Sequence, residues 1–404
     1  MRASGPIRPP AGALALGLAG ALVALGVVMR APVLFDYGGP WAPHQLNLVL
    51  MAHTGAYSDI SHLYFRDRLW QHPAPYLDFR FEYPVLTGVF VWVASFVHTS
   101  VATYFLFSAL LLLGLTLLTV WALGRIEGAN PWLFAAAPAL ALYTTLNWDL
   151  LGICLLVFAL ILFQRERDVR AAAVLALAVW AKVFPIVVLP VVLALRLADR
   201  RWRSALGIAG AFLAVTVAVN LPFALQGGAQ GPLRPAWSYF FTFTQQRPAR
   251  ATIWQPVLGH RADLLSVPLF AAGLAAIVVL AVRARDRPRG SLLPASSAAL
   301  LWLFATAKVY SPQYALWIFA ALAIEDAPVA LAIGFALLDV LIFATTFGPL
   351  YPVGPLASEF PRAVQWGAYG LRQLITAAFV LWLVREKLGA PARAVEPSYS
   401  TAAR

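Results

Sequence analysis

The sequence predicts an all-α polytopic membrane protein, a bundle of about 11–13 transmembrane helices with spans near 20 residues. Of its residues, 61% are hydrophobic and only 12% are charged, whereas a soluble domain carries about 25% charged residues. Apolar runs recur from one end of the chain to the other, and short basic clusters separate them. Such clusters orient membrane helices, so we expect no nucleic-acid partner despite the net charge of +12.

The first apolar run, residues 11–29, predicts an uncleaved membrane helix. A signal peptide is the alternative, but no small-residue cleavage site precedes Arg30 and many apolar runs follow. The organisation we expect is one transmembrane domain over 1–389, made of an external loop at 30–100 and a helical bundle at 101–389, followed by a disordered cytoplasmic tail at 390–404.

The later spans follow from placing the basic clusters in the cytoplasm. Those clusters are Arg2 with Arg8, 164–170, 196–203, 283–289 and 385–387. The expected spans are 11–29, 101–123, 131–146, 150–163, 171–183, 184–197, 204–225, 264–283, 292–308, 311–325, 328–347 and 367–384. Both termini are then cytoplasmic. The 27 arginines against three lysines favour a GC-rich genome, so the membrane we expect is a bacterial plasma membrane.

One apolar segment, residues 83–97, does not fit this topology. If it crossed the bilayer, every later loop would change sides and the arginine-rich loop 164–170 would be external. We expect it to be re-entrant or to lie along the external surface as a juxtamembrane helix. In the alternative, segment 83–97 crosses and two of the short downstream segments do not span separately.

Placed in this way, the polar segments between spans gather on the external face. They are 30–82, 147–149, the region of Lys182, 226–262, 310–313 and 348–366. The cytoplasmic loops carry little besides arginines. An active site at the external face is therefore expected, although no nucleotide-binding glycine loop and no Ser-His-Asp arrangement is present.

Asp59 is the candidate general base, because a loop carboxylate can accept a proton from an attacking hydroxyl. The alternative is a solvated loop aspartate or a helix N-cap, a position that Ser58 also suits. If residues 58–70 form a short helix, Tyr64 lies near Asp59. Arg66 belongs to the same stretch and is a candidate substrate-binding residue.

Two further acidic segments are candidates for substrate binding. Glu82 and Tyr83 precede Pro84, where a glutamate faces the positive end of a helix dipole; capping alone is the alternative. Asn147 and Asp149 stand between apolar runs, where a carboxylate commonly faces a wet cavity or a partner. A short external turn with an N-capping aspartate is equally compatible with that pattern.

Lys182 and Lys308 occur in similar settings, Ala-Lys-Val-aromatic followed by proline. Lysine is a compact cation suited to phosphate, so both are candidates for a phosphate site; snorkelling to the interface is the alternative. Ser311, Gln313 and Tyr314 follow Lys308 and offer hydrogen-bonding groups at the same face. Neither the histidines nor the single cysteine shows metal-ligand spacing, so we expect no required cofactor, with a divalent metal left open.

These segments, in this order, resemble a known enzyme family. Ser58-Asp59-Ile60, Phe81-Glu82-Tyr83-Pro84, Asn147-Trp148-Asp149, Lys182 to Pro185 and Ser311-Pro312-Gln313-Tyr314 are similar to blocks of the actinobacterial polyprenyl-phosphate-mannose-dependent mannosyltransferases. Those enzymes form glycosyltransferase family 87 in the GT-C superfamily. The resemblance covers roughly residues 55–325, and it departs from the family at Tyr83-Pro84-Val85, where many relatives have two prolines.

The resemblance implies a GT-C fold with juxtamembrane helices in the first external loop and Asp59 as general base. It also implies an inverting transferase that moves a sugar, mannose by resemblance, from a polyprenyl-phosphate donor to a lipid or glycan acceptor outside the cytoplasm. A polyprenyl-lipid or glycolipid flippase without bond chemistry is the alternative. A flippase would have polar groups throughout the membrane depth and an inverted repeat. No inverted repeat is apparent in the sequence.

Overall fold

The computed structural model describes residues 12–35, 55–97, 100–226, 235–287, 290–348 and 359–389. Within these ranges the chain is helical and contains no strand, only isolated bridges between Pro75 and Phe79 and between Arg250 and Val309. The predicted all-α fold is confirmed. The expected tail at 390–404 and most of the segment between Arg30 and Gly55 lie outside the described residues.

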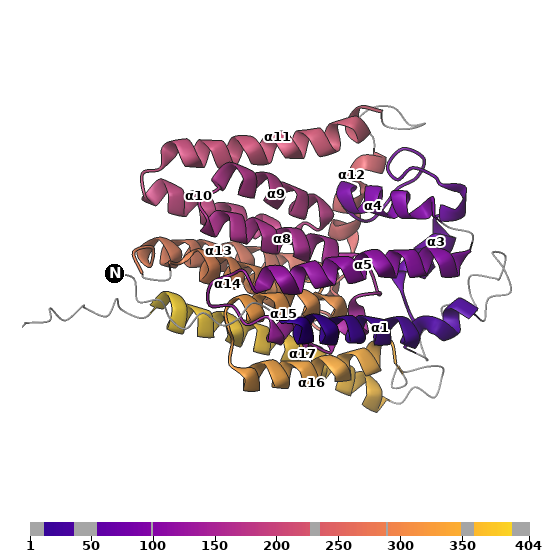
Figure 1. The fold of residues 1–404 in the computed structure, drawn as a ribbon. Coiled ribbons are helices and arrows are strands. Elements are labelled where there is room, and N and C mark those ends of the chain that lie inside the picture. The colour runs from indigo at the N-terminus through magenta and orange to yellow at the C-terminus, as the bar shows by residue number, and fades with distance from the viewer. Residues whose placement is uncertain are drawn as a thin grey trace, which may run out of the picture.

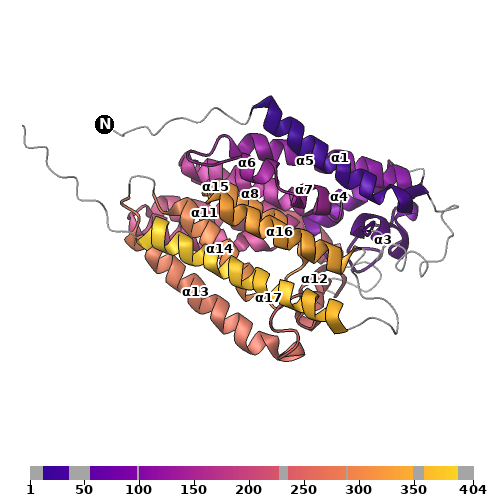
Figure 2. The ribbon, with the colours of Figure 1, turned by 90° about the horizontal axis from the view of Figure 1, so that it is seen from below.

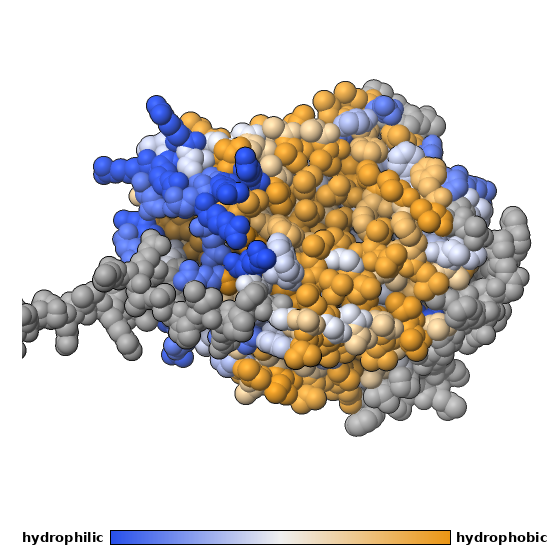
Figure 3. Space-filling view, viewed as in Figure 1, coloured by the Kyte–Doolittle hydropathy of each residue, from blue (hydrophilic) through white to orange (hydrophobic). Residues whose placement is uncertain are grey.

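Six helices in the described ranges are long and apolar enough to cross a membrane. They are α1 (Ala13–Phe35), α5 (Val101–Leu123), α11 (Trp202–Gln226), α13 (Asp263–Arg283), α16 (Val329–Thr346) and α17 (Glu359–Trp382). They run side by side along the length of the bundle (Figures 1 and 2). Apolar side chains form a broad belt between two more polar ends (Figure 3). The chain is therefore a polytopic membrane protein.

Shorter helices fill the centre of the bundle. They are α8 (Asp149–Gln164), α9 (Asp168–Ala181), α10 (Val188–Ala198), α14 (Leu292–Thr306) and α15 (Ala315–Ile324). Every residue of α15 is buried, and buried side chains from α1 to the end of α17 belong to one continuous apolar cluster. Because neighbouring helices cover them, these helices can be shorter than a bilayer is thick.

The prediction of a single span over residues 131–146 is wrong. The structure has two short helices there, α6 (Trp132–Ala135) and α7 (Ala139–Tyr143). Pro138 stands between them, and a proline has no N–H to continue a helix. The buried Arg30 of α1 donates to the Leu142 carbonyl at 2.7 Å, which satisfies a carbonyl at the end of α7.

The segment that did not fit the charge pattern forms α4 (Val85–Ser95). Eleven helical residues extend only about 16 Å, roughly half the hydrocarbon thickness of a bilayer. Helix α4 therefore cannot cross a membrane by itself. It packs against α9 and α5, and Gly88 lets it approach the Tyr76 ring, with which a Cβ at that position would clash.

The two ends of the bundle differ in chemistry. One end holds the α8–α9, α10–α11 and α13–α14 connections, where arginines are frequent; there Arg196 binds Asp168 through two hydrogen bonds of 2.9 and 2.8 Å. The opposite end holds α3 (Asp59–Arg66), α4 and α12 (Pro235–Gln246) (Figure 1). We refer to the latter as the α3–α12 end. It carries most of the candidate site residues.

Candidate active site

The connection that leads into α3 is tied to the turn before α8. Ser58 Oγ donates to the Thr145 carbonyl at 2.6 Å, and the Asp59 N–H donates to the Leu146 carbonyl at 2.8 Å. Ser58 also caps α3, because its Oγ accepts from the Ile60 N–H, as serine commonly does. The N-cap of α3 is thus Ser58, and Asp59 is the first residue of α3, next to the turn that precedes α8.

The Asp59 carboxylate accepts two phenol hydroxyls. Tyr57 Oη donates to Oδ1 at 2.7 Å, and Tyr83 Oη donates to Oδ2 at 2.8 Å. Burial, reinforced by the charge of Asp59, raises the pKa of Tyr57 and of Tyr83, so both phenols remain donors at neutral pH. The two bonds fix the direction of the carboxylate, and Asp59 is only half-buried. It can therefore receive a proton from a substrate hydroxyl within hydrogen-bond reach.

Asp149 and Lys182 form a buried ion pair beside Tyr83. Lys182 Nζ lies 2.6 Å from Asp149 Oδ1 and 4.8 Å from the centroid of the Tyr83 ring. The second oxygen of Asp149 accepts from Trp317 Nε1 at 3.2 Å. Tyr83 therefore connects the Asp59 carboxylate to the Lys182–Asp149 pair.

Asn147 and Gly152 help to hold that pair. Asn147 Oδ1 accepts from the Asp149 N–H at 3.1 Å, which fixes the start of α8. A Cβ on Gly152 would lie 2.9 Å from the Trp317 ring and 3.1 Å from Lys182 Cβ, closer than ordinary contacts. Glycine at this position lets both side chains pack against α8 and reach Asp149.

Glu82 is paired with Arg66 across the first loop. Arg66 Nη1 lies 2.9 Å from Glu82 Oε2, and Arg66 Nε lies 2.7 Å from Asp67 Oδ1. Burial raises the pKa of Glu82, and the charge of Arg66 opposes that rise. The N-cap of α4 is Pro84, with no side-chain cap, so Glu82 makes an ion pair rather than the hydrogen bond of a cap.

Tyr64 lies in an aromatic cluster on the inner side of α3. It is 2% exposed, and its ring centroid is 5.2 Å from that of Tyr104 and 5.6 Å from that of Trp70. The hydroxyls that donate hydrogen bonds to Asp59 belong to Tyr57 and Tyr83 instead. Tyr64 thus packs α3 against α5.

Lys308 belongs to a neighbouring cluster. Its Nζ lies 2.6 Å from Asp263 Oδ2 and donates to the Gln245 carbonyl at 2.8 Å. Tyr314 reaches the central pair, since its ring centroid lies 5.9 Å from Lys182 Nζ. Ser311 is the N-cap of the short 3-10 turn Pro312–Tyr314, and Gln313 is the middle residue of that turn; their predicted substrate contacts stay predictions.

Sequence reasoning missed several residues at the site. Tyr57 stands next to the Ser-Asp pair but was given no function, and Trp317 lies in an apolar run with no polar neighbour to mark it. Both reach the carboxylates only through the tertiary fold. Arg247 and Arg250 lie on the segment after α12, and their positive charge opposes the rise in pKa that burial causes at Glu82 and at Tyr57 respectively.

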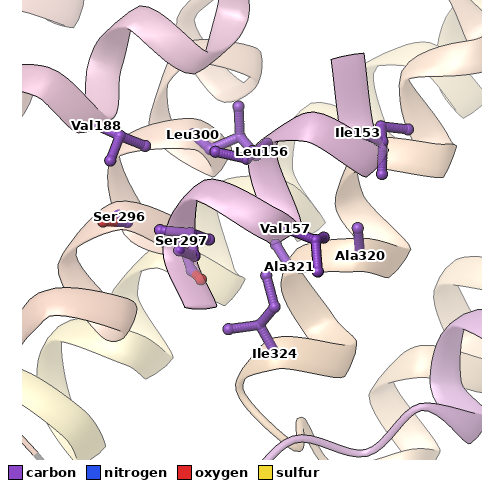
Figure 4. Close-up of a pocket in the computed structure, with 11 residues that line it drawn as sticks. Ile153, Leu156, Val157, Val188, Ser296, Ser297, Leu300, Ala320, Ala321 and Ile324 are labelled. Atoms are coloured by element: carbon purple, nitrogen blue, oxygen red, sulfur yellow. The ribbon is translucent and has the colours of Figure 1, made fainter. Parts of the chain in front are cut away.

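An apolar pocket lies deeper in the bundle, between α8, α14 and α15 (Figure 4). Its wall begins at Ile153, one helical turn inward from Asp149, and includes Leu156 and Ile324. Ser297 also lines it and donates to Glu325 at 2.9 Å. The pocket contains none of the candidate site residues.

In the part of the chain that the structure describes, no group of three or more His, Cys, Asp or Glu side chains is arranged to hold a metal ion. The network does combine an oriented, accessible carboxylate with a nearby cation. Such a pair can remove a proton from a hydroxyl and stabilise charge that develops on a neighbouring oxygen.

Comparison with known proteins identifies the family. A sequence model of glycosyltransferase family 87 matches residues 81–312, more than half of the chain, and the chain therefore belongs to that family. No curated protein matches it. The match includes Glu82, Tyr83, Asp149 and Lys182, whereas Asp59 precedes it.

Proposed function

We propose that this member of glycosyltransferase family 87 transfers mannose from a polyprenyl-phosphate donor to a lipid or glycan acceptor, with inversion at the anomeric carbon. The family supports the transfer of a sugar. The observation that carries the mechanism is the Asp59 carboxylate, held by two phenols next to the Lys182–Asp149 pair. We further propose that this end of the bundle faces the outside of a bacterial plasma membrane, because the arginine-rich turns are at the other end.

In this proposal Asp59 takes the proton of the acceptor hydroxyl. The acceptor oxygen attacks the anomeric carbon from the side opposite the phosphate and forms the new glycosidic bond. The bond between that carbon and the phosphate oxygen breaks, and its electron pair leaves with the polyprenyl phosphate. The donor carries its own leaving group, so the reaction requires no nucleotide or metal.

The other polar groups have supporting functions in the proposal. Lys182 donates a hydrogen bond to the departing oxygen while Asp149 keeps its ammonium in place, which favours the charge that develops there. Glu82 and Asp149 orient sugar hydroxyls. Lys308, paired with Asp263, contributes positive charge farther from the base.

The test is to incubate the purified protein with labelled polyprenyl-phosphate mannose and a membrane extract as acceptor. The proposal predicts a labelled glycoside whose anomeric configuration is opposite to that of the donor. A product of retained configuration would contradict the mechanism. Movement of the intact labelled lipid across a vesicle membrane without a new glycosidic bond would instead support a flippase.

A further inference from the structure

Tyr83 lies just before helix α4, on backbone that the helix itself does not hold. Helix α4 begins at Val85, with Pro84 as its N-cap, and the described residues 81–84 are irregular. The Tyr83 phenol nevertheless reaches Asp59 Oδ2 at 2.8 Å. Asp59 is fixed separately, because its N–H is bonded to the turn before α8. A group outside α4 therefore has to keep Tyr83 in register with Asp59.

Tyr76 is the group that holds this backbone. Its side chain is completely buried, and its Oη donates to the Tyr83 carbonyl at 2.8 Å and to the Pro84 carbonyl at 2.8 Å. Its ring packs edge-on against Phe223 of α11, with the ring centroids 5.5 Å apart. Gly88 of α4 admits the ring, since a Cβ at that position would clash with it. Tyr76 thus connects the backbone before α4 to helix α11.

The turn that carries Tyr76 closes without the Tyr76 hydroxyl. The Tyr76 N–H donates to the Phe79 carbonyl at 2.9 Å, and the Ala74 N–H donates to Asp78 Oδ2 at 2.6 Å. Tyr76 has a φ of +69°, a conformation that a non-glycine residue adopts only when its surroundings hold it. Because these bonds close the turn, removing the hydroxyl should release Tyr83 and leave the turn folded.

The second phenol on Asp59 is held independently of Tyr76. The Tyr57 ring stacks on Phe347 at the end of α16, with centroids 5.2 Å apart and an interplanar angle of 1°. Its Oη donates to Asp59 Oδ1 at 2.7 Å. Loss of the Tyr76 hydroxyl would therefore leave one of the two bonds on the carboxylate in place, and Asp59 should keep part of its orientation.

We infer that Tyr76 is a positioning residue of the transferase. Its hydroxyl fixes the Tyr83 backbone, and through the Tyr83 phenol it sets the direction of the Asp59 carboxylate. Groups at a reactive site keep a productive geometry only when packing and hydrogen bonds behind them hold it. The expected effect on transfer rests on the proposed function, whereas the expected effect on Tyr83 does not.

The first measurement follows Tyr83 directly by fluorine NMR. Meta-fluorotyrosine is placed at position 83 of the full chain in nanodiscs, and its resonance is recorded in the D59A, Y76F and Y310F backgrounds. D59A removes the acceptor and therefore marks the resonance of a released phenol. We expect Y76F to move the resonance toward the D59A position. Y310F should leave it unchanged, because the Tyr310 hydroxyl is hydrogen-bonded to Thr376 of α17 instead.

A Y76F resonance at the wild-type position would overturn the inference, and so would a resonance that D59A does not move. G88A displaces Tyr76 by another route, since the new methyl group would clash with its ring, and it replaces Y76F if that variant does not fold. The matched control is G114A, because a Cβ on Gly114 of α5 meets nothing within 4 Å. We expect G88A alone to move the resonance; equal resonances in G88A and G114A would contradict the inference.

Sugar transfer gives the second measurement, as a double-variant cycle of Y76F and Y83F with equal amounts of folded enzyme. We expect Y76F to lower kcat about three- to tenfold, as for loss of one hydrogen bond, with the KM for the donor unchanged. In the Y83F background Y76F should have little further effect, because the phenol that it positions is gone. Losses that multiply would show that Tyr76 acts independently of Tyr83, which would also overturn the inference.

The two measurements distinguish failure of the inference from failure of the proposed function. If the wild type transfers no sugar while Y76F moves the fluorine resonance, Tyr76 still positions Tyr83 and the proposed reaction is wrong. If the wild type transfers sugar and Y76F changes neither the resonance nor kcat, the reaction stands and Tyr76 has no positioning function.

Discussion

At the scale of single residues, the Asp59 carboxylate and its two phenol donors define the proposed site. Asp59 accepts from Tyr57 and Tyr83, and these bonds set the direction in which the carboxylate meets a substrate. The tyrosines are not interchangeable, because Tyr83 alone also contacts Lys182 through its ring face. Changes at Tyr83 should therefore affect the base and the cation together.

Replacing Tyr83 with Phe keeps the ring and removes the hydroxyl. A hydrogen bond to a charged group contributes about 1.5–3 kcal/mol, so we expect kcat to fall at least tenfold while the protein stays folded. Initial rates of the purified variant with labelled donor measure the effect. Y239F is the control, since Tyr239 of α12 contacts Arg80 through its ring; equal rates in both variants would contradict the assignment.

The buried Lys182–Asp149 pair should behave as a coupled unit. Removing one partner leaves an unpaired buried charge, which costs about 3–5 kcal/mol, whereas replacing both by apolar residues costs much less. We expect K182M and D149L each to lower the unfolding temperature, and the double variant to recover most of the loss without recovering transfer. Additive losses of stability would show that the two side chains are not coupled.

At the scale of elements, helix positions were easier to predict than helix breaks. The expected span 101–123 coincides with α5, because a long apolar run favours a single helix and the serine before it caps the first turn. The prediction of one span over 131–146 was wrong because Pro138 divides that segment.

Much of the candidate site was predictable, since carboxylates and lysines stand out in an apolar chain. Tyr57, Trp317, Arg247 and Arg250 could not be predicted as site residues, because their contacts depend on the three-dimensional fold.

Helix α8 offers a test of how tightly the site is packed. In G152A, the new methyl group would meet the Trp317 ring at 2.9 Å and Lys182 Cβ at 3.1 Å, so both side chains must move away from Asp149. We expect transfer to fall severalfold with a small loss of stability. G210A in α11 is the control, because a Cβ there meets nothing; unchanged transfer in G152A would show that this packing does not matter.

At the scale of the whole molecule, an apolar belt separates two more polar ends of the bundle (Figure 3), and the helix connections at one of these ends are rich in arginine. This polarity is the basis for the proposed orientation. Single cysteines at positions 78 and 286, in a C154S background, test it in intact cells with a membrane-impermeant maleimide. We expect D78C to be labelled directly and D286C only after permeabilisation; the reverse pattern would contradict the proposed topology.

The central claim is that Asp59 is the general base of sugar transfer. The most direct measurement compares D59N with the wild type, using purified protein, labelled polyprenyl-phosphate mannose and equal amounts of folded enzyme. A general base contributes about 10²–10⁴-fold, so the account predicts that D59N loses at least a hundredfold in kcat, while D286N at the other end keeps wild-type activity. Turnover by D59N within a few fold of the wild type would contradict the account.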